Sequence, residues 1–114
     1  MPLDKKTIGQ KSQPKVTLVS IPEWEESVYI RQMNSRERDR YEGESLEAKG
    51  RFWDNLRARL LVVTLSDAEG NRLYQDDELE AVASIPGPVA DLLWSAAMSL
   101  NKMFKEDVIA TEKN

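Results

Sequence analysis

Apolar and polar residues alternate along two neighbouring stretches near the start of the chain, and this spacing predicts β-strands. In residues 16–21, Thr17, Val19 and Ile21 share one side, and the other side takes Val16, Leu18 and Ser20. In residues 27–33, Val28 and Ile30 share one side, and the other side takes Tyr29, Arg31 and Met33. The connection Pro22–Glu26 begins with a proline, which suits the start of a turn because it has no N–H to donate to a ladder. The pattern predicts an antiparallel β-hairpin.

Helical spacing follows in residues 34–66. Asn34 and Glu37 have the separation of a capping box, which indicates a helix N-terminus. Gly43 and Gly50 flank a weak polar stretch and predict a break. A stronger helix is indicated by apolar residues three and four positions apart: Phe52, Trp53, Leu56, Leu60, Val63 and Leu65. This helix is expected to end in the turn Asp67–Asn71, where Gly70 can take a positive φ.

The last part of the chain predicts a short extended piece and two helices. Arg72–Tyr74 reads as extended, and Gln75 or Asp76 is positioned to cap a short helix that ends at Ile85–Pro88. The final helix has the clearest apolar stripe in the sequence, formed by Val89, Leu92, Leu93, Ala96, Ala97, Leu100, Met103 and Phe104.

These elements predict an α+β fold in which a small N-terminal antiparallel hairpin or sheet packs against three to four α-helices. Residues 1–15 contain few large apolar side chains and carry a net charge of +3, so we expect a flexible basic arm. Residues 16–114 are expected to form a single domain, with the hairpin in residues 16–33 and mainly helical structure in residues 34–114.

Composition narrows the functional classes. The 114 residues contain no histidine and no cysteine, which excludes a Ser-His-Asp triad, a cysteine nucleophile and a thiolate zinc site. Residues 60–114 carry a net charge of −6, the opposite of the basic face of a nucleic-acid binder. The longest apolar run, Leu60–Leu65, is far shorter than a membrane span. We therefore expect no enzymatic activity, no cofactor or metal, and no binding to nucleic acid or membrane.

Six acidic residues crowd the stretch 67–80 and invite comparison with a calcium-binding loop. From Asp67, an EF-hand would need glycine at its sixth position, where this chain has Arg72, and Gly70 occupies the fourth position instead. A turn followed by a capped helix accounts for the carboxylates, because negative charge is favourable at a helix N-terminus. A small metal-dependent enzyme that uses these carboxylates is the weaker alternative.

A second apolar patch lies on the final helix, away from its stripe. Trp94 and Met98 are one turn apart on the opposite side, with Ala90 beside them. Either the helix is covered on both sides within one chain, or this patch faces a partner. Together with Trp24 in the hairpin turn, these residues are the candidate partner-binding set. If the patch faces a partner, Trp94→Ala weakens partner binding and leaves the unfolding midpoint almost unchanged.

Four segments carry a resemblance to a known family: IPEWEESVYIRQMNSRERDRYE, NLRARLLVVTLSDAEGNRLYQDDELEAV, VADLLWSAAMSLN and the closing EDVIATEKN. In their order and spacing over residues 16–114, they resemble the tail assembly chaperones of long-tailed, siphovirus-type bacteriophages. Pro86–Pro88 and the stretch from Gly43 to Gly50 depart from the family's usual pattern.

The resemblance implies a non-enzymatic chaperone of the host cytoplasm that is absent from the mature virion. Such proteins bind and solubilise the tape measure protein and help to recruit tail tube subunits, mainly through a form that is extended by a programmed frameshift. Self-association into a homo-oligomer is compatible with this role. The alternative is a structural tail or head-to-tail completion protein that is retained in the virion.

Overall fold

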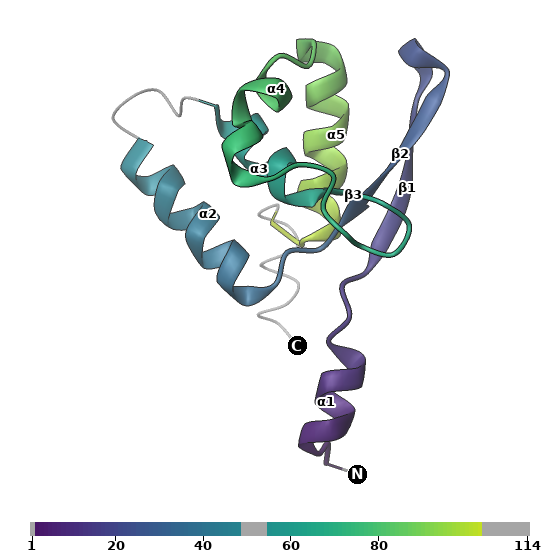
Figure 1. Ribbon diagram of the computed structural model, residues 1–114, viewed down its shortest axis with the longest axis vertical. Helices are drawn as coiled ribbons and strands as arrows, with labels where there is room; N and C mark the ends of the chain where they lie inside the picture. Colours follow the sequence, from purple (N-terminus) through teal and green to yellow (C-terminus); the bar gives the residue numbers. More distant parts are fainter. Residues whose placement is uncertain (1, 49–54, 104–114) are drawn as a thin grey trace.

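The computed structural model describes residues 2–48 and 55–103, and it confirms the α+β class (Figure 1). The chain runs through a short helix, a hairpin, two helices, a third strand and two further helices. In order the elements are α1 (Lys5–Lys11), β1 (Val16–Ile21), the 3-10 turn η1 (Pro22–Trp24), β2 (Glu26–Arg31), α2 (Ser35–Ala48), α3 (Leu56–Thr64), β3 (Leu65–Ser66), the 3-10 turn η3 (Asp76–Glu78), α4 (Leu79–Ala83) and α5 (Gly87–Leu100).

The predicted hairpin is confirmed, and it belongs to a three-stranded antiparallel sheet in the order β1-β2-β3. Leu65 was expected at the end of a helix, and this expectation is wrong. The helix α3 ends at Thr64, and Leu65 turns into an extended conformation that pairs with Ile30 of β2. The expected extended piece at Arg72–Tyr74 is reduced to a single bridge between Arg72 and Ser66. At Leu65, therefore, pairing with β2 has overridden the helical spacing of the apolar residues.

One face of the hairpin forms part of the core. The register sets Val19 opposite Val28, and on the same face Ile21 and Ile30 are 3% and 0% exposed. The helix α5 contacts both β1 and β2, and its Leu93 is 1% exposed. Burial of such side chains away from water is the main force that holds the helix on the sheet.

Arg31 departs from its expected environment. Alternation along β2 put it on the side of Tyr29, yet Arg31 is only 6% exposed. It is the last residue of β2, so its side chain reaches the adjoining helices: Nε donates to the Val63 carbonyl at 2.9 Å, and Nη2 lies 2.5 Å from Glu37 Oε2. The buried charge is therefore paired and hydrogen-bonded, as a buried charge must be.

The helix α2 begins as its sequence predicts. Glu37 N donates to Asn34 Oδ1 at 2.8 Å, and Asn34 N donates to Glu37 Oε1 at 2.9 Å, which makes a reciprocal capping box. The carboxylate of Glu37 thus serves both the cap and the buried Arg31. The break expected in the stretch from Gly43 to Gly50 is not found at Gly43, because α2 continues through it to Ala48. Gly50 and the apolar residues Phe52, Trp53 and Phe104 lie outside the described residues.

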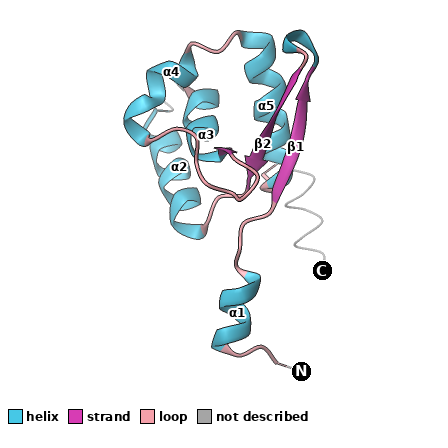
Figure 2. Cartoon of the chain, turned by 45° about the vertical axis from the view of Figure 1, so that its right-hand side comes forward, coloured by secondary structure: helices cyan, strands magenta, loops and turns pink. Residues whose placement is uncertain are grey.

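The helices α2, α4 and α5 surround α3. This helix is buried at Ala58, Leu60, Leu61 and Val62, and it contacts α5, α4 and α2. In contrast, α1 stands apart from the body in both views and has no buried residue (Figures 1 and 2). Its N-cap is Asp4, whose side chain accepts a hydrogen bond from Thr7 N at 2.8 Å. The arm expected in residues 1–15 therefore contains a short capped helix.

Candidate partner-binding surfaces

Apolar side chains that remain in contact with water are the main feature of this surface. Among the described residues, no three His, Cys, Asp or Glu side chains are grouped so that they could hold a metal ion. None of the described helices has the length and apolar character of a membrane span. Within residues 2–48 and 55–103, the large apolar side chains left exposed include Leu3, Ile8, Leu18, Trp24, Leu73 and Leu92.

Two of the candidate residues on α5, Ala90 and Trp94, lie beside residues of α3. Ala90 is only 8% exposed, and Trp94 and Met98 are half-buried against the core. The guanidinium of Arg57 lies 5.7 Å from the centroid of the Trp94 ring, a cation–π distance, and Arg57 also forms an ion pair with Asp91. The helix α5 is therefore covered on both sides within one chain, the first of the two arrangements that the sequence allowed. Trp94 and Met98 keep part of their surface open to a partner.

Trp24 belongs to a different part of the molecule, the turn of the hairpin. It closes η1 and is 47% exposed. The next residue, Glu25, has a left-handed φ of 53° and donates from its N–H to the Pro22 carbonyl at 3.2 Å. The turn η1 joins β1 to β2 at the end of the hairpin that lies far from α1 (Figure 2).

Leu18 is an exposed residue that the sequence analysis left out of the candidate set. It is 57% exposed and lies on the outer face of β1, opposite Tyr29 in the register. The alternation already put Leu18 on the face away from Ile21. Its exposure could have been inferred if Ile21 had been assigned to the core.

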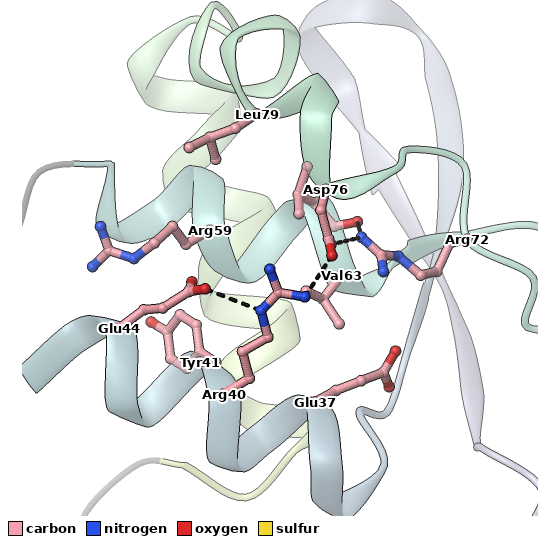
Figure 3. Close-up of a pocket in the computed structure, with 10 residues that line it drawn as sticks. Glu37, Arg40, Tyr41, Glu44, Arg59, Val63, Arg72, Asp76 and Leu79 are labelled. Atoms are coloured by element: carbon pink, nitrogen blue, oxygen red, sulfur yellow. Dashed lines mark hydrogen bonds and ion pairs between the residues drawn. The ribbon is translucent and has the colours of Figure 1, made fainter.

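A small cavity of about 150 Å³, lined by both charged and apolar side chains, lies where α2, α3 and the start of η3 meet (Figure 3). Within this lining, Asp76 binds two arginines: Arg40 Nη1 lies 2.6 Å from Oδ2, and Arg72 Nη2 lies 2.7 Å from Oδ1. Arg40 also pairs with Glu44 at 3.1 Å. The charged residues of the lining are three arginines and three acidic residues: Arg40, Arg59, Arg72, Glu37, Glu44 and Asp76. Their charges balance, so the cavity has no net preference for an anion.

Asp76 was expected to cap a helix, or in the weaker alternative to bind a metal. The hydrogen bonds from Arg72, and then from Arg40, hold the pKa of its carboxyl below the usual value. A carboxylate with both oxygens bonded to arginine and a lowered pKa is a poor proton acceptor at neutral pH. Its role here is to join α2 to the connection between β3 and α4.

Asp67 likewise serves a turn. Its Oδ1 accepts hydrogen bonds from the backbone N–H of Glu69 and Asn71, both at 2.9 Å, and these bonds lower the pKa of the carboxyl. Gly70 has a φ of +86°, as predicted for the turn. The same carboxylate that resembled the start of a calcium loop therefore closes the turn itself.

Comparison with known proteins defines the class of protein to which this fold and surface belong. The family model of the phage tail assembly chaperone matches residues 6–114. The chain therefore belongs to the phage tail assembly chaperone family.

A solved structure has the same fold. It is described as the structure of bacteriophage HK97 tail assembly chaperone, is 23% identical in sequence and superposes with a TM-score of 0.61. The match covers 85% of this chain and 95% of the HK97 chain. No curated protein sequence matches the chain.

Proposed function

We propose that this protein binds the tape measure protein of its phage, keeps it soluble, and helps to recruit tail tube subunits around it. The observation that carries the proposal is the family match over residues 6–114, which supports a role as a tail assembly chaperone. Membership of a chaperone family implies a non-enzymatic role. The chaperone acts in the host cytoplasm and leaves before the virion is mature.

Two surfaces are proposed to contact the tape measure protein. One is the part-open strip of Trp94 and Met98 on α5, with Arg57 and Asp91 at its border. The other is Trp24 in the hairpin turn, which is 47% exposed. An apolar centre with a charged border is the usual composition of a protein interface. Modest contacts of this kind, repeated by many copies along one long client, give strong total binding while each copy stays removable.

Recruitment of the tail tube protein is assigned mainly to a longer form of the chain, made by a programmed frameshift. In this proposal the chain described here coats the tape measure protein, and the extended form adds the contact with tube subunits. The acidic residues between Asp67 and Glu80 form an additional contact region for basic segments of either partner.

Co-expression tests the proposal. The chain is produced together with the long helical protein encoded just downstream, and the soluble fraction and co-purification of that client are measured. We expect the chain to increase the soluble client and to co-purify with it, either alone or with its extended form. A client that remains insoluble and unbound with both forms present would contradict the proposal.

Single variants then locate the client surface. Trp94→Ala and Trp24→Ala are expected to reduce client solubilisation, whereas Ile8→Ala, at a residue of α1 with 51% exposure, serves as the control outside all of these contact regions. If the protein is instead a structural tail or head-to-tail completion protein, it is found in purified virions by mass spectrometry. That result would replace the chaperone proposal.

A further inference from the structure

The strand β1 has one open edge. It pairs with β2 on one side, and no other strand of the described residues pairs with it (Figures 1 and 2). Proteins usually protect such an edge with a lysine, a proline, a bulge or a short strand. The six residues of β1, VTLVSI, contain none of these protecting residues, and the strand runs unbroken through its register with β2. The edge therefore offers free N–H and C=O groups to another strand.

The outer face of the same strand carries an unfinished apolar row. Leu18 lies opposite Tyr29, which is half-buried, while Leu18 itself is 57% exposed. A strand added at the edge would place one more side chain directly beside Leu18, about 5 Å away between Cβ atoms. An apolar side chain at that position would remove Leu18 from water.

The distribution of charge selects the strand that fits. Lys11 and Lys15 precede β1, and Glu23, Glu25 and Glu26 follow it. When two copies of this segment pair antiparallel, the basic end of each lies beside the acidic end of the other. Parallel pairing would instead bring like charges together, which is unfavourable. The segment is thus complementary to itself in the antiparallel direction.

The register follows from the faces of the sheet. Opposite residues of an antiparallel pair point to the same side, so the outer-face residues Val16, Leu18 and Ser20 must meet one another. Two registers put outer-face residues opposite one another while most of the two β1 strands overlap: Leu18 opposite Ser20, and Leu18 opposite Leu18. Setting Leu18 opposite Ser20 puts Val16 opposite Pro22, which has no N–H, and it leaves each Leu18 without an apolar neighbour. Setting Leu18 opposite Leu18 avoids both problems.

We propose that β1 pairs antiparallel with β1 of a second copy, with Leu18 opposite Leu18, and so joins the two sheets into one of six strands. The outer face then carries the continuous row Tyr29, Leu18, Leu18, Tyr29. Lys15 of each copy lies beside Ile21 of the other, next to Glu23.

The absence of cysteine from the natural chain permits a direct test of the register. A purified Leu18→Cys variant, treated with a short bismaleimide at low protein concentration, is expected to form a covalent dimer with twice the 13.0 kDa of one chain. Leu73→Cys is the matched control, because Leu73 has a similar exposure of 48% and lies outside β1. Equal crosslinking of the two variants, or none at residue 18, would overturn the proposal.

The mass of the assembly gives a second test that uses the purified chain alone and needs no client. By light scattering, Leu18→Lys is expected to lower the wild-type mass at least twofold, with the far-ultraviolet circular dichroism unchanged. Leu92→Lys, at an exposed residue of α5, is expected to keep the wild-type mass. A wild type that stays at 13.0 kDa would overturn the proposal, as would a Leu18→Lys variant with the wild-type mass.

A charge exchange keeps the test valid if Leu18→Lys does not fold, because it leaves β1 intact. Lys15→Glu is expected to lower the fraction of associated chain, and the double variant with Glu23→Lys is expected to restore it. If Lys15→Glu has no effect on association, the charge-selected antiparallel pairing is wrong.

Discussion

Asn101 is a single buried residue that joins three parts of the chain. Its Oδ1 accepts from Met33 N at 2.7 Å, its Nδ2 donates to the Ala97 carbonyl at 2.9 Å, and its own carbonyl accepts from Arg38 at 3.1 Å. Asn101→Ala leaves the Met33 N–H without its acceptor. We expect the free energy of unfolding to fall by about 1–3 kcal/mol. Urea titration followed by circular dichroism measures the change, with Ser99→Ala, at an exposed position, expected to stay near wild type.

Leu93 and Leu92 are neighbours on α5 with opposite environments, at 1% and 39% exposure. Leu93→Ala is expected to destabilise the protein by about 2–5 kcal/mol, because it removes buried methyl groups and leaves a cavity at the contact with the hairpin. Leu92→Ala is the control, and its effect should be clearly smaller. The loss of unfolding free energy in the two variants is measured by thermal and urea unfolding. Equal losses would show that α5 is rotated relative to the sheet.

Residue by residue, the apolar core was more predictable than its polar members. Val89, Leu93 and Ala97 follow from the stripe on α5, because helical spacing alone determines a shared face. Arg31 and Asn101 do not follow from any local pattern. Each is buried because its partners come from other segments, such as Glu37 and Val63 for Arg31, and those meetings depend on the tertiary arrangement.

At the scale of elements, the turn between β3 and η3 depends on one glycine. Gly70 has a φ of +86°, and a Cβ there would lie 3.3 Å from Pro14 Cγ. Gly70→Ala is expected to cost about 1–2 kcal/mol, the strain of a left-handed backbone with a side chain. In Gly43→Ala the added methyl meets nothing within 4 Å inside α2, so this control should gain up to about 1 kcal/mol. If urea titration shows that both variants change the free energy of unfolding in the same direction, this backbone explanation is wrong.

The hairpin, the cap of α2 and the apolar face of α5 were predictable because each rests on short-range spacing. The strand β3 was not, since its two residues are too few for a periodic signal and continue the apolar spacing of α3. The candidate site was predictable only in part. The position of Trp94 off the stripe was visible in the sequence, but its contact with Arg57 depends on how α3 packs against α5. Leu18 required knowledge of which hairpin face meets the helix.

At the scale of the whole molecule, three carboxyls in the described part of the chain link stability to pH. Hydrogen bonds lower the pKa of Asp4, Asp67 and Asp76 from the ordinary value of 3.8. A lowered pKa in the folded state means that the stabilisation is present above pH 3.8 and is lost as the pH falls through the lowered values. We therefore expect the unfolding midpoint to drop in acid below pH 3.8.

Asp76→Asn isolates one contribution to that pH dependence. Near neutral pH the variant loses both arginine pairs. Because the Asp76 and Arg40 side chains are exposed and that of Arg72 is only part-buried, the expected cost is at most about 1 kcal/mol. Its stability should also depend less on pH than that of the wild type below pH 3.8. Parallel unfolding curves for the two proteins across the acid range, with a constant difference, would be inconsistent with the ion-pair explanation.

The position of α5 in the chain has a consequence for synthesis on the ribosome. The inner face of the hairpin, with Ile21 and Ile30, is complete once residue 31 has been made, but the helix that covers it ends at Leu100. About seventy further residues must therefore be translated before α5 can cover this apolar face. A nascent chain halted before α5 would present Ile21 and Ile30 to water, and it should be a good substrate for host factors that bind emerging polypeptides.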